Sequence, residues 1–136
     1  MLWLTIGTFL FYSLNVTGFK IGKFILVRSC IKDEPIDLAF WVPYLAFVIT
    51  FYYRPDIGKW LLISFYFIGF TILSINTYRF TIWPNERKIK GYNKCFEKTH
   101  HIIPASEKRL IPDTFHIILY VLLLINLIVM FIFIVK

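Results

Sequence analysis

The chain has 136 residues, of which 58% are hydrophobic and 20% aromatic, and it carries a formal net charge of +7. Its mean hydropathy of +0.68 excludes an ordinary soluble domain, because so short a chain cannot bury its long apolar stretches in a core. The basic excess therefore indicates an orientation across a membrane and contact with anionic lipid, and it excludes nucleic acid because no soluble domain remains to bind it.

Four apolar stretches occupy most of the chain, and no Asp, Glu, Lys or Arg lies in the middle of any of them. They span residues 2–19, 36–53, 60–78 and 114–135. Each is close to the ~20 residues that a helix needs to cross a hydrocarbon core. We predict an all-α integral membrane protein, in which residues 1–136 form a single membrane domain of four transmembrane helices. Spans without buried charge give no sign of a proton relay or an ion-coupling site.

The segment after the first stretch has two interpretations. In the first, the helix continues through residues 24–27, while Lys20 and Lys23 extend their ammonium groups to the lipid headgroups. In the second, residues 19–27 lie flat on the membrane surface. We take the continuous helix as the prediction.

Proline and acidic residues mark the ends of the later helices. Residues 33–35, Asp-Glu-Pro, predict the start of the second helix, because acids favour the positive end of the helix dipole and proline fits the first turn. Pro43 lies inside that helix and is expected to kink it. Residues 54–59 predict a tight turn between two antiparallel helices. Residues 112–114, Pro-Asp-Thr, open the fourth helix in the same way as residues 33–35 open the second.

Residues 86–103 alternate apolar and basic side chains at helical spacing, with Asn85 placed to cap the start and Pro104 to end the helix. The apolar stripe consists of Ile89, Tyr92, Phe96, Thr99 and Ile103. This pattern predicts a basic amphipathic interfacial helix in the third connection, which recognises anionic lipid or docks a partner. A loop that returns along the membrane with one wet face is the alternative. The candidate lipid- or partner-contacting residues are Arg87, Lys90, Lys94, Lys98, Lys108 and Arg109.

The basic residues also predict the orientation. Twelve of the 15 Lys and Arg residues lie in connections 20–35 and 79–113, which share one side of a four-span protein. The positive-inside rule places that side in the cytoplasm, or in the matrix of an organelle, and both termini outside. The expected location is a bacterial cytoplasmic membrane or an organellar inner membrane. Cys30 and Cys95 lie on the cytoplasmic side, where thiols stay reduced, so we predict a structural or incidental role for each.

Few polar residues lie within the spans, and they have two interpretations. The candidates are Asn15, Ser64, Thr71, Ser74, Asn76, His116 and Asn126. In the preferred interpretation they form hydrogen bonds between helices, with Asn15 and Asn126 as the strongest candidates. In the alternative they line a pore, because Ser64, Thr71 and Ser74 share one face of the third helix.

The chain carries no recognisable catalytic or metal-binding pattern, and we predict no catalytic residue, no metal and no cofactor. Glycine-rich phosphate loops, His-Glu-x-x-His and Gly-x-Ser-x-Gly are absent from the sequence. One cluster has the right residue types for a metal, but its spacing matches no standard zinc site. It consists of Cys95, Glu97, His100, His101 and His116.

Three hypotheses for function remain. The first is a non-enzymatic membrane protein that acts through protein or lipid contacts, as an accessory subunit of a larger complex, an assembly factor or an immunity-type factor. The second is a homo-oligomeric pore or carrier for a small solute or ion. The third is a lipid-modifying enzyme, which requires Glu97, His100 or His101 to converge with Glu107 and Asp113.

Overall fold

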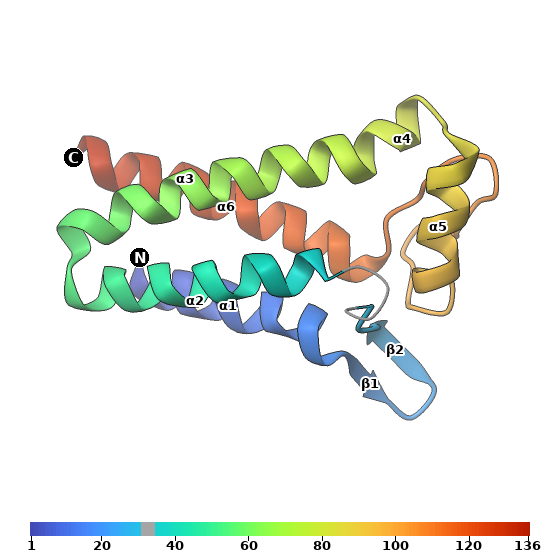
Figure 1. The fold of residues 1–136 in the computed structure, drawn as a ribbon, viewed down its shortest axis with the longest axis horizontal. Coiled ribbons are helices and arrows are strands. Elements are labelled where there is room, and N and C mark those ends of the chain that lie inside the picture. The colour runs from blue at the N-terminus through green and yellow to red at the C-terminus, as the bar shows by residue number, and fades with distance from the viewer. Residues whose placement is uncertain (31–34) are drawn as a thin grey trace.

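A computed structural model describes residues 1–30 and 35–136, so the helix start predicted at residues 33–34 lies outside the described residues. The chain is mostly helical (Figure 1). In chain order the elements are α1 (Leu2–Thr17), β1 (Phe19–Ile21), β2 (Phe24–Val27), α2 (Ile36–Tyr53), α3 (Pro55–Leu73), the π-helical turn η1 (Ser74–Tyr78), α4 (Arg79–Ile82), α5 (Glu86–Phe96) and α6 (Thr114–Val135).

Four helices, α1, α2, α3 and α6, lie side by side as a bundle, with both chain termini at the end opposite α5 (Figure 1). The bundle core is aromatic at its centre: Tyr44, Tyr66 and Phe115 have no exposed surface. Three helices are long and apolar enough to cross a membrane, namely Ile36–Tyr53, Pro55–Ile82 and Thr114–Val135. The prediction of a helical chain is thus confirmed, with three helices that could cross a membrane. The fourth bundle helix, α1, is apolar but has only 16 residues.

The prediction that the first helix continues through residues 24–27 is wrong, because that segment forms a β-hairpin. Helix α1 ends at Thr17 and is followed by Gly18, whose φ of +75° is a conformation that residues with a Cβ rarely adopt. Strands β1 and β2 pair antiparallel around Gly22, which has a φ of +58°. The apolar residues 24–27 satisfy their backbone groups partly through this pairing, and Val27 is only 1% exposed. The two glycines therefore end the helix and allow a hairpin, although the segment between and after them is apolar.

The third helix is longer than the apolar stretch that predicted it. It begins at Pro55, passes through η1 and ends at Ile82, a total of 28 residues. At 1.5 Å per residue this is roughly 40 Å, which exceeds the ~30 Å of a hydrocarbon core. The helix is also longer than α1, α2 and α6, which have 16, 18 and 22 residues, and its α4 end extends past them (Figure 1). Pro84 lies shortly after its last residue.

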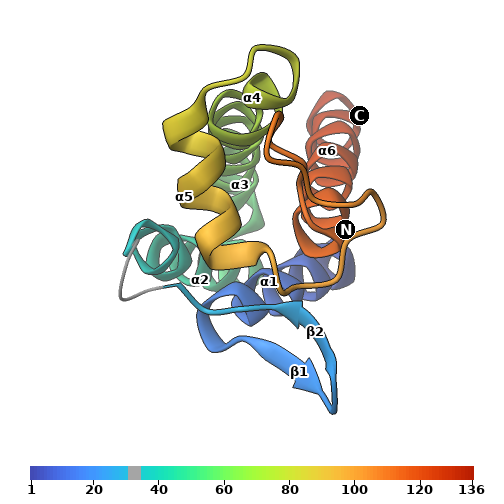
Figure 2. The same cartoon turned by 90° about the vertical axis from the view of Figure 1, so that its right-hand side faces the viewer.

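The connection from residue 83 to residue 113, which we call the cap, lies across this end of the bundle (Figures 1 and 2). Its helix α5 begins as predicted, since the Oδ1 atom of Asn85 accepts a hydrogen bond of 3.2 Å from the backbone N–H of Lys88. It ends at Phe96, well before the predicted end at Pro104. Ile89 and Phe96 are 2% and 8% exposed and face the bundle, whereas Ile103 is 54% exposed. The predicted apolar stripe is therefore buried only up to Thr99.

Candidate functional site: a polar network beneath the cap

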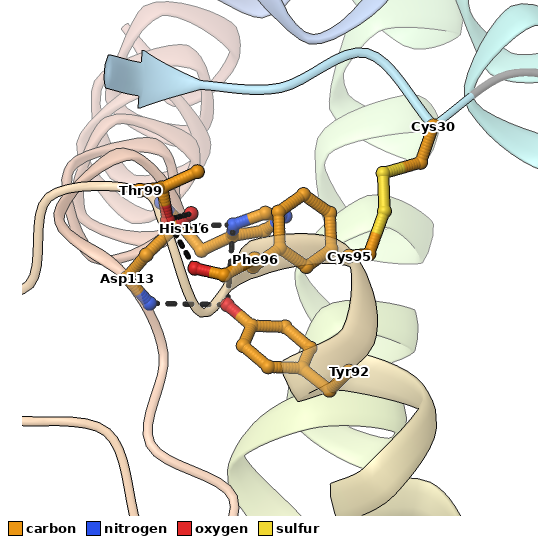
Figure 3. Close-up of a disulfide and its surroundings, with 7 residues drawn as sticks. All are labelled: Cys30, Tyr92, Cys95, Phe96, Thr99, Asp113 and His116. Atoms are coloured by element: carbon orange, nitrogen blue, oxygen red, sulfur yellow. Dashed lines mark hydrogen bonds and ion pairs between the residues drawn. A yellow bond between two sulfur atoms is a disulfide. The ribbon is translucent and has the colours of Figure 1, made fainter. Parts of the chain in front are cut away.

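A buried aspartate and histidine join the cap to the start of α6 (Figure 3). Asp113 is the N-cap residue of α6, and its Oδ1 atom accepts a hydrogen bond of 2.9 Å from the backbone N–H of His116. The same oxygen lies 2.6 Å from the Nδ1 atom of His116. The side chain of Asp113 has no exposed surface, and that of His116 keeps 10%. The pair thus combines a helix cap with a buried polar contact.

Two cap residues complete the network around Asp113. The hydroxyl of Thr99 donates a hydrogen bond of 2.8 Å to its Oδ2 atom. The hydroxyl of Tyr92, from α5, accepts a hydrogen bond of 3.0 Å from the backbone N–H of Asp113 and lies 3.4 Å from His116 Nδ1. Both carboxylate oxygens of Asp113 are therefore occupied. The network fixes α5 and the loop after it to the first turn of α6.

Burial and hydrogen bonding shift the pKa of Asp113 in opposite directions. Burial alone would raise the pKa of Asp113, but the hydrogen bonds and charge of His116, with the bond from Thr99, lower it below its usual value of 3.8. Burial next to this carboxylate raises the pKa of Tyr92 well above 10. Asp113 is therefore ionised at neutral pH, while Tyr92 is protonated.

A disulfide lies beside the network and joins Cys30 to Cys95 of α5, with the two Cα atoms 6.6 Å apart (Figure 3). The expectation that both thiols stay reduced is wrong for this structure. The hairpin returns the chain from α1 to the cap, and this brings together two residues that are 65 positions apart. The backbone N–H of His100 also donates a 2.7 Å hydrogen bond to the carbonyl of Ile25 in β2. The hairpin, the cap and α6 are thus one connected body.

The extended end of the third helix holds the loop of the cap. The backbone N–H of Leu110 donates to the carbonyl of Phe80, and the hydroxyl of Thr81 donates to the carbonyl of Leu110. The Nδ1 atom of His100 lies 2.7 Å from the hydroxyl of Thr114, and this contact joins the loop to α6. Each side of the cap is therefore anchored to a different helix of the bundle.

The geometry suits a structural anchor better than a reaction centre. The Phe96 and Phe115 rings lie 4.8 and 5.4 Å from the ring of His116 and cover the network. Among the residues that a lipid-modifying enzyme would require, Glu97 and Glu107 are exposed and, within residues 1–30 and 35–136, make no hydrogen bond or ion pair with Asp113. His100 contacts Thr114, the residue after Asp113, and the ring of His101 donates to the carbonyl of Thr99. Within the same two described ranges, no three His, Cys, Asp or Glu side chains are close enough to share a metal ion.

The structure places the predicted polar residues of the spans in two groups. Asn126 has no exposed surface and donates a 2.7 Å hydrogen bond from Nδ2 to the hydroxyl of Thr8 in α1. Asn15 is also buried, at 2%, but its Oδ1 atom has no hydrogen-bond partner within the described residues. By contrast, Ser64 and Thr71 donate to carbonyls one turn earlier in their own helix. Ser74 does the same and also contacts the hydroxyl of Tyr120, while Asn76 is exposed.

Asn126 should stabilise the bundle by a modest amount. We expect Asn126→Leu to lower the free energy of unfolding by about 1 kcal/mol, in line with hydrogen bonds between membrane helices. In a double-mutant cycle with Thr8→Val, most of this loss should be coupling between the two positions. The measurement is reversible unfolding in mixed micelles, with Asn76→Leu as the exposed control. Purely additive losses would show that the bond contributes nothing.

All six predicted contact residues of the cap are exposed, and within the described residues none of their side chains takes part in an ion pair or a hydrogen bond. They are Arg87, Lys90, Lys94, Lys98, Lys108 and Arg109. These positions are predictable from the sequence, whereas the buried network of Tyr92, Thr99 and Asp113 was not predicted. One signal was present, because Asp113 and His116 have the spacing of an N-cap residue and the third residue of a helix.

The fold and the network together define a helical bundle that has three helices able to cross a membrane and a disulfide-linked, basic cap at one end. Comparison of the chain with models of protein families, with curated proteins and with solved structures gave no match.

Proposed function

We propose that the chain is a four-span, non-catalytic membrane protein that acts as an accessory or assembly-type subunit by docking an acidic partner protein on its cap. One observation carries the proposal: the two faces of the cap have different roles. The underside is held by the bundle through Ile89, Phe96 and the Asp113 network. The basic residues on the other face are exposed and unpaired within the described residues.

Support for α1 as the fourth span comes from its packing. Trp41 of α2 donates a 2.8 Å hydrogen bond from Nε1 to the hydroxyl of Ser13, and Asn126 of α6 donates to Thr8. The side chains of Thr8 and Ser13 therefore contact neighbouring helices, while Leu10 is 60% exposed. A helix of 16 residues is about 24 Å long, so α1 spans with its flanking residues at the interfaces.

The burial of α5 favours a protein partner over the lipid surface. A helix that binds a bilayer must insert its apolar face among the acyl chains. In α5 that face is already occupied, because Ile89 and Phe96 are buried and Tyr92 contacts Asp113. Helix α5 crosses the end of the bundle (Figure 2), and its basic residues Arg87, Lys90 and Lys94 are exposed there. Exposed cations in this position attract an acidic surface and speed its association.

The test compares two variants with equal loss of charge. The cap variant replaces four cations by glutamine: Arg87, Lys90, Lys94 and Lys98. The matched control replaces four cations elsewhere: Lys20, Lys23, Lys59 and Lys136. Native mass spectrometry of protein extracted in native nanodiscs should show a stoichiometric protein partner with the wild type and the control and none with the cap variant. Raising the salt concentration should also release this partner.

The same measurement separates the proposal from its alternatives. A homodimer or larger ring without another protein would favour the pore or carrier, although the hydroxyls of Ser64 and Thr71 bond within their own helix. If the wild type is a monomer with bound anionic lipid, and only the cap variant loses that lipid, the ligand of the cap is lipid and not a protein. Either result would overturn the docking proposal.

A further inference from the structure

The only two cysteines of the chain form one disulfide, and it joins the cap to the segment after the hairpin. Cys30 is 6% exposed and therefore lies within the folded body formed by the hairpin and the cap. Disulfides of this kind persist in oxidising compartments, whereas glutathione and thioredoxin keep cytoplasmic thiols reduced. The bond therefore carries information about which side of the membrane the cap occupies.

We infer that the cap and the hairpin face an oxidising compartment, so that in a cytoplasmic membrane they lie outside the cell. Both termini and the turn between α2 and α3 lie at the other end of the bundle (Figure 1) and are then cytoplasmic. This is the reverse of the orientation that the positive-inside rule predicts. The rule describes a bias in membrane insertion, whereas an oxidised cysteine pair requires a compartment that maintains it.

The orientation also specifies the partner, and this step rests on the proposed function. If the basic face of the cap docks an acidic protein, that protein is extracytoplasmic or has an extracytoplasmic domain. The three cations that remain in the cytoplasm, Arg54, Lys59 and Lys136, then lie at the ends of α2, α3 and α6, where they contact the anionic headgroups of the inner leaflet.

Single-cysteine reporters test the orientation directly. In a Cys30→Ser, Cys95→Ser background, Glu107→Cys places a thiol on the cap and Asp56→Cys places one on the opposite turn; both positions are exposed. A membrane-impermeant maleimide should label position 107 in intact cells, and position 56 only after permeabilisation. The reverse pattern would overturn the inference.

The native cysteines provide a second test that needs no substitution. In intact cells the wild type should give no maleimide adduct until an impermeant phosphine reductant is added, and then a mass shift of two adducts. Two adducts that form without reductant, and only after lysis, would show reduced cytoplasmic thiols and overturn the inference. Neither labelling result depends on a partner. In a nanodisc both sides of the membrane are open to solution, so partner binding can be measured whichever way the cap faces. A failure of the docking proposal is therefore distinguishable from a failure of the orientation.

Discussion

Asp113→Ala is expected to loosen the cap and to lower the free energy of unfolding by about 2–4 kcal/mol, because losing a buried acceptor costs about 1–3 kcal/mol and losing an N-cap about 1 kcal/mol. The substitution removes the carboxylate acceptor of His116 Nδ1 and the N-cap of α6, and it leaves the hydroxyl of Thr99 with only the carbonyl of Phe96 as an acceptor. Hydrogen exchange should increase across the cap, and unfolding in mixed micelles should begin at lower denaturant.

An exposed acid provides the control for this prediction. Asp56 contacts Arg54 at 3.4 Å, and both side chains are more than 60% exposed, at 63% and 64%. Asp56→Ala should therefore change stability little, because exposed ion pairs contribute little. Equal losses for the two variants would contradict a structural role for the network.

Asp113 also predicts how the stability of the cap depends on pH. Its pKa in the folded state is lower than the usual value of 3.8, so the unfolded chain binds the proton more readily. The stabilisation is fully present above pH 3.8 and is lost as the pH falls through the folded-state pKa. Asp113→Asn should remove this loss in acid, and unfolding measured from pH 6 to pH 2, roughly the range over which a carboxyl titrates, checks it. An unchanged acid response in the variant would assign the loss to other carboxyls.

Gly58→Ala is expected to destabilise the bundle by about 1–3 kcal/mol, the typical cost of overpacking. Gly58 lies in the first turn of α3, and a Cβ added there would overlap the backbone N and Cα atoms of Phe51 in α2. Backbone atoms within a helix cannot yield as a flexible side chain does, so α2 and α3 must separate. Because Phe51 is 5% exposed and packs in the core, the separation should extend into the bundle.

A second glycine isolates the steric effect from helix propensity. A Cβ added at Gly7 in α1 would meet no atom within 4 Å, so Gly7→Ala should be neutral or slightly stabilising. Reversible unfolding of both variants in the same micelles measures the difference. A Gly58→Ala variant as stable as the wild type would show that α2 and α3 are less closely packed than the structure indicates.

Local patterns in the sequence determined much of the helical part of this protein. Helices α2 and α6 coincide with the apolar stretches 36–53 and 114–135, because a long run of apolar side chains without charge is sufficient to specify a buried or lipid-facing helix. Asn85 starts α5 through a hydrogen bond to a residue only three positions ahead. Such signals depend on neighbours along the chain and are therefore visible in the sequence.

The tertiary structure decided what the local patterns left open. Residues 19–27 carry an apolar run that suits a helix, yet the glycines at 18 and 22 and the pairing of two strands make a hairpin. That hairpin brings Cys30 to Cys95, and the cap brings Thr99 and Tyr92 to Asp113. Each contact joins residues between 14 and 65 positions apart, so it cannot be predicted from the spacing of neighbouring residues. The sequence by itself determined a helical chain with apolar helices able to cross a membrane and a basic connection between two of them. Only the tertiary contacts decided that this connection folds into a cap tied to the bundle.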